Sequence, residues 1–86
     1  MASYEIVFKK SVAKDLKKIP KRDVARILKA IKHLAKDPRP PQSKKLSGQE
    51  RYRLRQGNFR ILYSIEDAIL VVTVVKVGNR RDVYRV

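Results

Sequence analysis

Hydrophobic and polar positions repeat with two different periods along this chain. In the first half the apolar residues recur at helical spacing, whereas in the second half they alternate or run together as they do in β-strands. A short run of β-branched and aromatic residues at 4–8 comes before the helical part and predicts a first strand. The predicted order of elements is therefore βααββββ.

Two amphipathic helices, forming a helical hairpin, are predicted between residues 11 and 35. The Ser11 hydroxyl is expected to cap the first helix, and Pro20 is expected to open the second, because its fixed φ suits the first helical position. His33 is expected on the polar side of the second helix. The apolar stripes that should face the core are Val12, Leu16 and Ile19 in the first helix, and Val24, Ile27, Leu28, Ile31, Leu34 and Ala35 in the second.

Residues 36–48 contain three prolines and end on Ser-Gly, a composition typical of an extended connector without regular structure. Strands are expected after it at 51–56, 58–65, 68–77 and 82–86, and the continuous apolar run at 68–77 predicts a central strand buried on both sides. Helices followed by strands predict an α+β fold, in which the helical pair covers one face of a mainly antiparallel sheet. The length of 86 residues fits a single domain over 1–86.

The sequence Gln-Gly-Asn-Phe at 56–59 predicts a hairpin with a two-residue turn, because Gly57 tolerates a positive φ. This turn pairs Tyr52 with Tyr63 and Arg55 with Arg60. Alternation then gathers the apolar side chains of the hairpin on one face and the arginines on the other: Arg51, Arg53, Arg55 and Arg60.

Like charges placed directly opposite each other destabilise a strand pair by up to about 1 kcal/mol, so the pairing of Arg55 with Arg60 suggests a bound anion. A solvated face of long side chains is the simpler alternative. Arginine at all four positions favours the anion, because the guanidinium group matches phosphate oxygens in a bidentate way.

Composition also points to a polyanionic partner. The chain has 22 Lys and Arg against 8 Asp and Glu, a net charge of +14 at pH 7 that attracts nucleic acid, an acidic membrane surface or an acidic protein. The absence of cysteine and the single histidine exclude a disulfide framework, a thiol nucleophile and a zinc cluster. No apolar run approaches the ~20 residues that span a bilayer, so we expect a cytoplasmic protein without a membrane partner.

After the turn signal at Gly78-Asn79, the C-terminus presents Arg80, Arg81 and Tyr84. A tyrosine beside arginines offers a stacking surface next to phosphate-binding groups, an arrangement that commonly holds single-stranded RNA. A charged turn and an edge or core aromatic are the simpler explanations for these residues.

The segments KKLSG (44–48), RYRLRQGNFRILYSI (51–65) and VVTVVKVGNRRDVYR (71–85) resemble the RelE branch of the RelE/ParE toxin superfamily. The resemblance implies a toxin that enters the ribosomal A site and cuts mRNA without a metal or cofactor: the ribose 2′-hydroxyl attacks the adjacent phosphate and leaves a 2′,3′-cyclic phosphate and a 5′-hydroxyl. The catalytic residues that it implies are Arg53, Arg55, Arg60, Arg80 and Tyr84, with Arg81 as the alternative to Arg80. The residues expected to contact RNA are Lys44, Lys45, Arg51 and Arg81.

In this scheme Arg53, Arg55 and Arg60 stabilise the charge that develops on the non-bridging phosphate oxygens. Arg80 would protonate or electrostatically stabilise the leaving 5′-oxygen, and Tyr84 would stack on a base or orient the 2′-hydroxyl. The best-known members carry lysines where this chain has Arg53 and Arg55, and arginine is a poor proton acceptor, so the general base is left unidentified. Arg60→Ala should abolish cleavage and leave the fold intact, because the face on which Arg60 lies is expected to be polar.

The resemblance also implies a cognate acidic antitoxin that binds the toxin, a heterotetramer of the two as one candidate assembly, and the ribosome and mRNA as further partners. Because the chain ends soon after Tyr84, we do not expect inhibition by displacement of a C-terminal helix. Two rival functions stay open: a ParE-type toxin acting on DNA gyrase, and a plain RNA- or DNA-binding module. The complete set of arginines with the tyrosine favours RNA cleavage, which gives those residues a use.

Overall fold

The computed structural model describes residues 3–46, 48 and 50–79 of the chain. Strand β1 (Glu5–Phe8) leads into helices α1 (Lys10–Lys17) and α2 (Lys21–His33), and strands β2 (Ser43–Lys45), β3 (Tyr52–Gln56), β4 (Phe59–Glu66) and β5 (Val71–Asn79) follow. The sheet order is β1-β5-β4-β3-β2, with β1 parallel to β5 and every other pair antiparallel. The α+β fold with a mainly antiparallel sheet is therefore confirmed.

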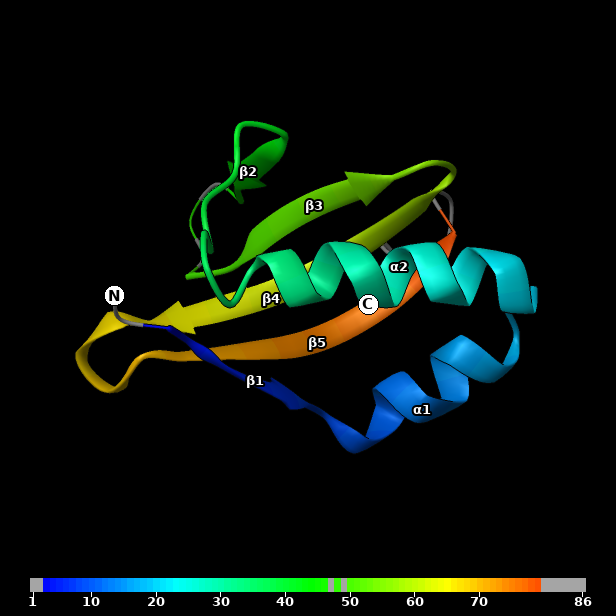
Figure 1. Cartoon of the computed structure of the whole chain (residues 1–86), viewed down its shortest axis with the longest axis horizontal. Helices are drawn as coiled ribbons and strands as arrows, with labels where there is room; N and C mark the ends of the chain where they lie inside the picture. The colour runs from blue at the N-terminus through cyan, green and yellow to red at the C-terminus, as the bar shows by residue number, and fades with distance from the viewer. Residues whose placement is uncertain (1–2, 47, 49, 80–86) are drawn as a thin grey trace.

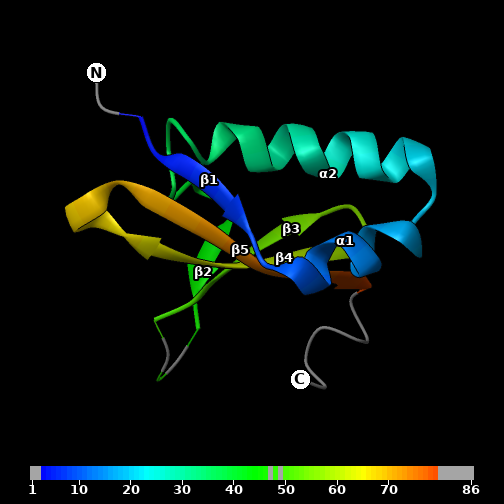
Figure 2. The same ribbon diagram turned by 90° about the horizontal axis from the view of Figure 1, so that it is seen from below.

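The helices and the sheet form two layers. Helix α2 lies across one face of the sheet, while α1 lies beside β5 at the end of the sheet where β1 stops (Figures 1 and 2). Buried apolar side chains fill the space between the layers: Val12, Ile19, Ile27, Ile31 and Leu34 from the helical layer, and Leu54, Ile61, Tyr63, Val72, Val74 and Val77 from the sheet. Each fully buried aliphatic side chain contributes about 1.5–3 kcal/mol, so this core is what holds α2 on the sheet.

The two helices differ from the sequence-based expectations in three respects. Helix α1 begins at Lys10 and its N-cap is Lys9, without a side-chain cap, so Ser11 does not cap it. Pro20 lies just before α2 instead of opening it, and its carbonyl oxygen accepts hydrogen bonds from the N–H groups of residues 23 and 24 at 2.9 and 3.0 Å. Leu28 is 37% exposed, because it lies one residue beyond the buried Ile27 and is turned by about 100° toward the outer side of the helix.

The strand boundaries differ from the prediction at two places. Ser43–Lys45 form the edge strand β2 against β3, so the connector at 36–48 is not irregular throughout. Asp67–Ile69 form a 3-10 turn and Leu70 has a positive φ of 53°, so β5 begins only at Val71. β5 does lie between β1 and β4 as expected of a central strand. The expectation that it is buried on both sides is wrong, because only Val72, Val74 and Val77, which reach the core, are buried. The strand predicted at 82–86 lies outside the described residues.

The β3–β4 hairpin has the predicted register. Tyr52 pairs with Tyr63, Arg55 pairs with Arg60, and the turn consists of residues 57–58. Gly57 has a φ of 59° and Asn58 does not have a positive φ, the pattern of a type II′ turn. Tight turns of this type match the twist of the flanking strands, which is why the register could be read from the sequence.

A cluster of polar side chains closes the other end of the hairpin, and we call Tyr4, Arg39, Tyr52 and Asp67 the Arg39 cluster. Arg39 donates to the Asp67 carboxylate at 2.8 and 3.2 Å and to the Tyr52 hydroxyl at 3.1 Å. The Tyr4 hydroxyl donates to Asp67 at 2.6 Å. The hydrogen bonds from Arg39 and Tyr4 lower the pKa of the Asp67 carboxyl to about 2, and the bond to Asp67 raises the pKa of the Arg39 guanidinium.

Within the described part of the chain, neither helix has the length and apolar character needed to cross a membrane.

Candidate nucleic-acid interface

Basic side chains gather on the sheet face that α2 does not cover, and we call Lys44, Arg53, Arg55, Arg60 and Lys76 the cationic face. Residues that pair across strands share a face of the sheet. One row across the sheet runs Lys44, Arg53, Leu62 and Lys76, and the next runs Arg55, Arg60 and Gly78. Four strands therefore contribute to one basic surface.

The positive charge is concentrated toward the turn of the β3–β4 hairpin. Along β4, the residues on this face are Arg60, Leu62, Ser64 and Glu66, in order of distance from the turn. The only acid of this series is at the far end. An anion is therefore attracted most strongly to the half of the face that contains both rows of cations.

The arginines of the cationic face differ in exposure. Arg55 is exposed and Arg53 is partly buried, but Arg60 is only 5% exposed. The side chain of Arg60 is therefore not on an open polar surface, which was the basis for expecting Arg60→Ala to leave the fold intact. Arg60 lies on the middle strand of the sheet, with Arg55 opposite it on β3 and Gly78 opposite it on β5.

The other residues predicted to form the site are not part of the cationic face as the structure describes it. Lys45 pairs with Tyr52, which puts it on the face that α2 covers, and its ammonium lies 3.7 Å from the Glu50 carboxylate. Arg51 precedes β3, and its carbonyl oxygen accepts a hydrogen bond from the Leu46 N–H at 2.8 Å. The remaining predicted residues, Arg80, Arg81 and Tyr84, lie outside the described part of the chain.

Lys76 belongs to the cationic face although the sequence pattern did not indicate it. It lies inside the apolar run at 68–77, which predicts burial on both sides. The register between β4 and β5 shifts between Leu62 and Tyr63, so that Leu62 pairs with Lys76 while Tyr63 pairs with Val74. This irregularity lets Lys76 face the arginines while Val74 and Val77 both reach the core. A lysine in an otherwise apolar strand was the signal available in the sequence.

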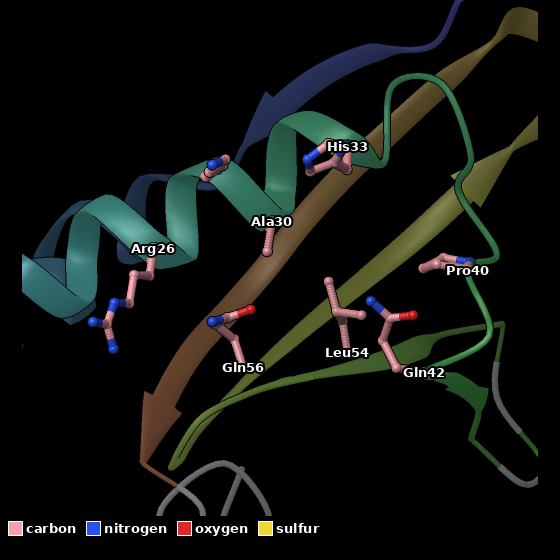
Figure 3. Close-up of a pocket in the computed structure, with 8 residues that line it drawn as sticks. Arg26, Ala30, His33, Pro40, Gln42, Leu54 and Gln56 are labelled. Carbon is pink, nitrogen blue, oxygen red and sulfur yellow. The ribbon is translucent and has the colours of Figure 1, made fainter.

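The single histidine lies on the opposite side of the sheet. His33 is exposed, as expected, and lines a cavity of about 230 Å³ between α2 and β3, together with Arg26, Leu54 and Gln56 (Figure 3). The sheet separates this cavity from the cationic face. Within residues 3–46, 48 and 50–79, no group of three or more His, Cys, Asp or Glu side chains is placed to hold a metal ion.

The chemistry available to the cationic face follows from its residue types. Strand pairing fixes the backbone positions of these arginines side by side, so their guanidinium groups can converge on phosphate oxygens and stabilise developing negative charge. Arginines cannot act as proton acceptors near neutral pH. The described part of the face is therefore suited to binding and electrostatic stabilisation of a phosphodiester, and proton transfer needs another group.

Comparisons with known proteins agree with this fold. A sequence model described as the ParE toxin of the type II toxin–antitoxin system parDE matches residues 6–84. Toxin RelG from Mycobacterium tuberculosis is 31% identical over 86 residues, which cover 95% of this chain and 97% of that protein. Putative toxin RelE1 from Methanocaldococcus jannaschii is 30% identical over 88 residues, covering 95% and 96% of the two chains.

Solved structures give the same result. A chain from the archaeal RelE–RelB complex of Pyrococcus horikoshii OT3 superposes with a TM-score of 0.83 at 29% identity, covering 93% of this chain and 98% of that one. A chain from the RelBE2 toxin–antitoxin complex of Mycobacterium tuberculosis has the same TM-score of 0.83 at 28% identity, covering 95% and 97%.

Proposed function

The chain belongs to the RelE/ParE superfamily of toxins, and from this premise we propose that it is a ribosome-dependent endoribonuclease that cleaves mRNA in the A site. The observation that carries the proposal is the pairing of Arg55 with Arg60 beside Arg53, on one face of a rigid sheet. Opposed like charges destabilise a strand pair. A bound phosphodiester would offset this repulsion.

In the proposed reaction the ribose 2′-hydroxyl loses its proton and attacks the adjacent phosphorus atom. The bond from phosphorus to the 5′-oxygen breaks, and that oxygen takes up a proton. The products are a 2′,3′-cyclic phosphate and a 5′-hydroxyl, and no metal takes part. Arg53, Arg55 and Arg60 stabilise the negative charge on the non-bridging oxygens, which is the electrostatic contribution that preorganised cations make best.

Two further roles rest on the resemblance to RelE. Arg80, or Arg81 in its place, stabilises the leaving 5′-oxygen, and Tyr84 stacks on a base or orients the 2′-hydroxyl. Because the arginines of the cationic face are poor proton acceptors, the enzyme relies on the ribosome to align its substrate. This dependence agrees with a toxin that acts on mRNA only in the A site.

The proposed regulator is an acidic antitoxin encoded with the toxin. The Pyrococcus horikoshii and Mycobacterium tuberculosis relatives were solved as complexes named RelE–RelB and RelBE2. A net charge of +14 would steer such a partner toward this chain and make association fast and salt-sensitive. We place the complex in the cytoplasm, where ribosomes translate.

A ParE-type activity on DNA gyrase is the second candidate, because the matching family model is described as ParE. The residues of the cationic face favour RNA cleavage over this activity. RelE-type and ParE-type toxins share this fold, so only an assay of the reaction can distinguish the two functions.

A ribosome-programmed cleavage assay tests the proposal. Ribosomes carrying a defined mRNA are incubated with purified toxin, and cleavage sites are mapped by primer extension; a gyrase supercoiling assay runs in parallel. Codon-dependent cuts in the A site support the proposal, and the Arg53→Gln, Arg55→Gln double variant is the matched inactive control. Inhibition of gyrase without mRNA cleavage would establish the ParE activity instead. RNA binding with neither activity would reduce the protein to a binding module.

A further inference from the structure

Lys76 forms an ion pair with Asp15, an acidic residue of α1. The Lys76 Nζ lies 3.7 Å from Oδ1 of Asp15, and the two side chains are 27% and 14% exposed. The other carboxylate oxygen, Oδ2, accepts a hydrogen bond from the backbone N–H of Val77 at 3.2 Å. Asp15 is thus fixed by the backbone of β5 and holds Lys76 loosely.

The position of Asp15 follows from the topology of the sheet. β1 ends at Phe8, which pairs with Val74, so the rest of β5 has no strand on that side. Helix α1 occupies this place beside β5 (Figure 2). The N–H of Val77 would otherwise lack its ladder partner, and a buried donor without an acceptor is costly. Asp15 satisfies this donor, and the bond does not involve Lys76.

We infer that Lys76 is a phosphate-binding residue of the cationic face, and that it exchanges Asp15 for an RNA phosphate when RNA binds. The inference rests on the proposed function only in taking RNA as the ligand. The register places Lys76 in the same row as Arg53 and Lys44, with Leu62 between Lys76 and Arg53. A phosphate bound in this row would lie within the field of all three cations.

The geometry of the pair favours exchange. Hydrogen bonds between charged groups are typically about 2.7–2.9 Å long, so a separation of 3.7 Å between Lys76 and Asp15 is a loose ion pair. Lysine has a flexible four-carbon stem and can turn its ammonium toward a new partner. When Lys76 leaves, Asp15 keeps its bond to the Val77 N–H. Exchange of Asp15 for a phosphate at the Lys76 ammonium therefore costs little free energy. By competing for this ammonium, Asp15 lowers the affinity for RNA.

The test is the salt dependence of RNA binding. A fluorescein-labelled single-stranded RNA oligonucleotide is titrated with the full chain over a series of KCl concentrations, and Kd is measured by fluorescence anisotropy. The proteins are the parent, Lys76→Gln, Asp15→Asn and their double variant. Lys32→Gln is the matched control, because Lys32 is an exposed lysine of α2, on the other side of the sheet. Thermal melts confirm that each variant is folded.

Lys76→Gln should reduce the slope of log Kd against log salt by about 0.7, the value for one lost phosphate contact on a single strand. Asp15→Asn keeps an oxygen acceptor for Val77 but removes the competing charge. It should tighten binding by about two- to fivefold, the free energy of a partly exposed ion pair. This gain should vanish in the double variant, because it depends on Lys76.

Two results would overturn the inference: a slope for Lys76→Gln equal to that of Lys32→Gln, or tighter binding by Asp15→Asn that persists in the double variant. Arg53→Gln, measured in the same series, separates this failure from failure of the proposed function. If Arg53→Gln lowers the slope and Lys76→Gln does not, only the role of Lys76 is refuted. If neither changes the slope, the cationic face is not the RNA site, and the proposed function loses its basis as well.

Discussion

Arginines have two different environments at the two ends of the β3–β4 hairpin. Arg39 lies at the end away from the turn and is surrounded by partners of complementary character: the Asp67 carboxylate at 2.8 Å and the Tyr52 ring, whose centroid is 5.3 Å away. Arg55 and Arg60, near the turn, lie opposite each other. The Arg39 cluster pairs its arginine with a carboxylate, whereas the cationic face places two arginines opposite each other.

On the proposed function, we expect this contrast to separate an arginine that stabilises the fold from arginines that bind a ligand. The Arg39 cluster joins the residue before β1, the connector after α2, strand β3 and the turn before β5, so its loss should affect stability. The cationic face places Arg55 opposite Arg60, so we expect substitution of Arg53 and Arg55 to affect function.

The largest effect is expected from the Arg53→Gln, Arg55→Gln double variant. Cleavage of ribosome-bound mRNA should fall by at least about 100-fold, because removing one preorganised donor to a developing anion typically costs that much. The melting temperature should not fall, since neither side chain belongs to the core. Cleavage at the parental rate in a single-turnover assay would remove these residues from the mechanism.

Arg60→Ala should damage both function and stability, which makes it an intermediate case. Removing a like charge opposite Arg55 gains at most about 1 kcal/mol. Truncating a side chain that is 5% exposed costs about 1–3 kcal/mol, so the loss should dominate. Urea unfolding should therefore show a less stable protein, whereas Arg55→Ala, at an exposed position, should unfold like the parent. Unchanged stability of Arg60→Ala would mean that repulsion and burial cancel.

Arg39→Gln should lower stability and leave cleavage unchanged, the reverse of the pattern expected for Arg53→Gln, Arg55→Gln. It removes the ion pair with Asp67 and the stacking on Tyr52, so the melting temperature should fall slightly, because both charged groups are largely exposed. Cleavage per folded molecule should be unchanged. A large loss of cleavage in a fully folded Arg39→Gln protein would contradict the division between the two ends of the hairpin.

The smallest effect concerns pH. Because the pKa of Asp67 is lowered from its ordinary value of 3.8 to about 2, its ionised form stabilises the folded state at pH values above 3.8. This contribution is lost as the pH falls from 3.8 through 2. Asp67→Asn should be less stable than the parent at neutral pH, and the difference should shrink across this interval. Urea midpoints measured along a pH series check this, and a constant difference would be inconsistent with the lowered pKa.

The sequence predicted the hairpin register because a tight turn and period-2 alternation fix which residues pair. It did not predict β2, because three residues after a proline-rich stretch carry too short a pattern and become a strand only through pairing with β3. The face on which Lys76 lies depends on the register shift after Leu62, and the burial of Arg60 is a property of the folded chain that strand alternation does not indicate. Local patterns predict on which face of a regular strand a side chain lies. Irregular strand pairing and the burial of a side chain arise only in the assembled sheet.

The most direct test of the proposed reaction is the fate of an mRNA that lacks one 2′-hydroxyl. Ribosomes are programmed with two mRNAs that differ only by a 2′-deoxynucleotide on the 5′ side of the mapped A-site cleavage point, and the termini of the products are identified. We predict cleavage of the all-ribose mRNA with a 2′,3′-cyclic phosphate, and no cleavage at that point in its deoxy counterpart. Equal cleavage of both mRNAs, or of neither, would contradict the account.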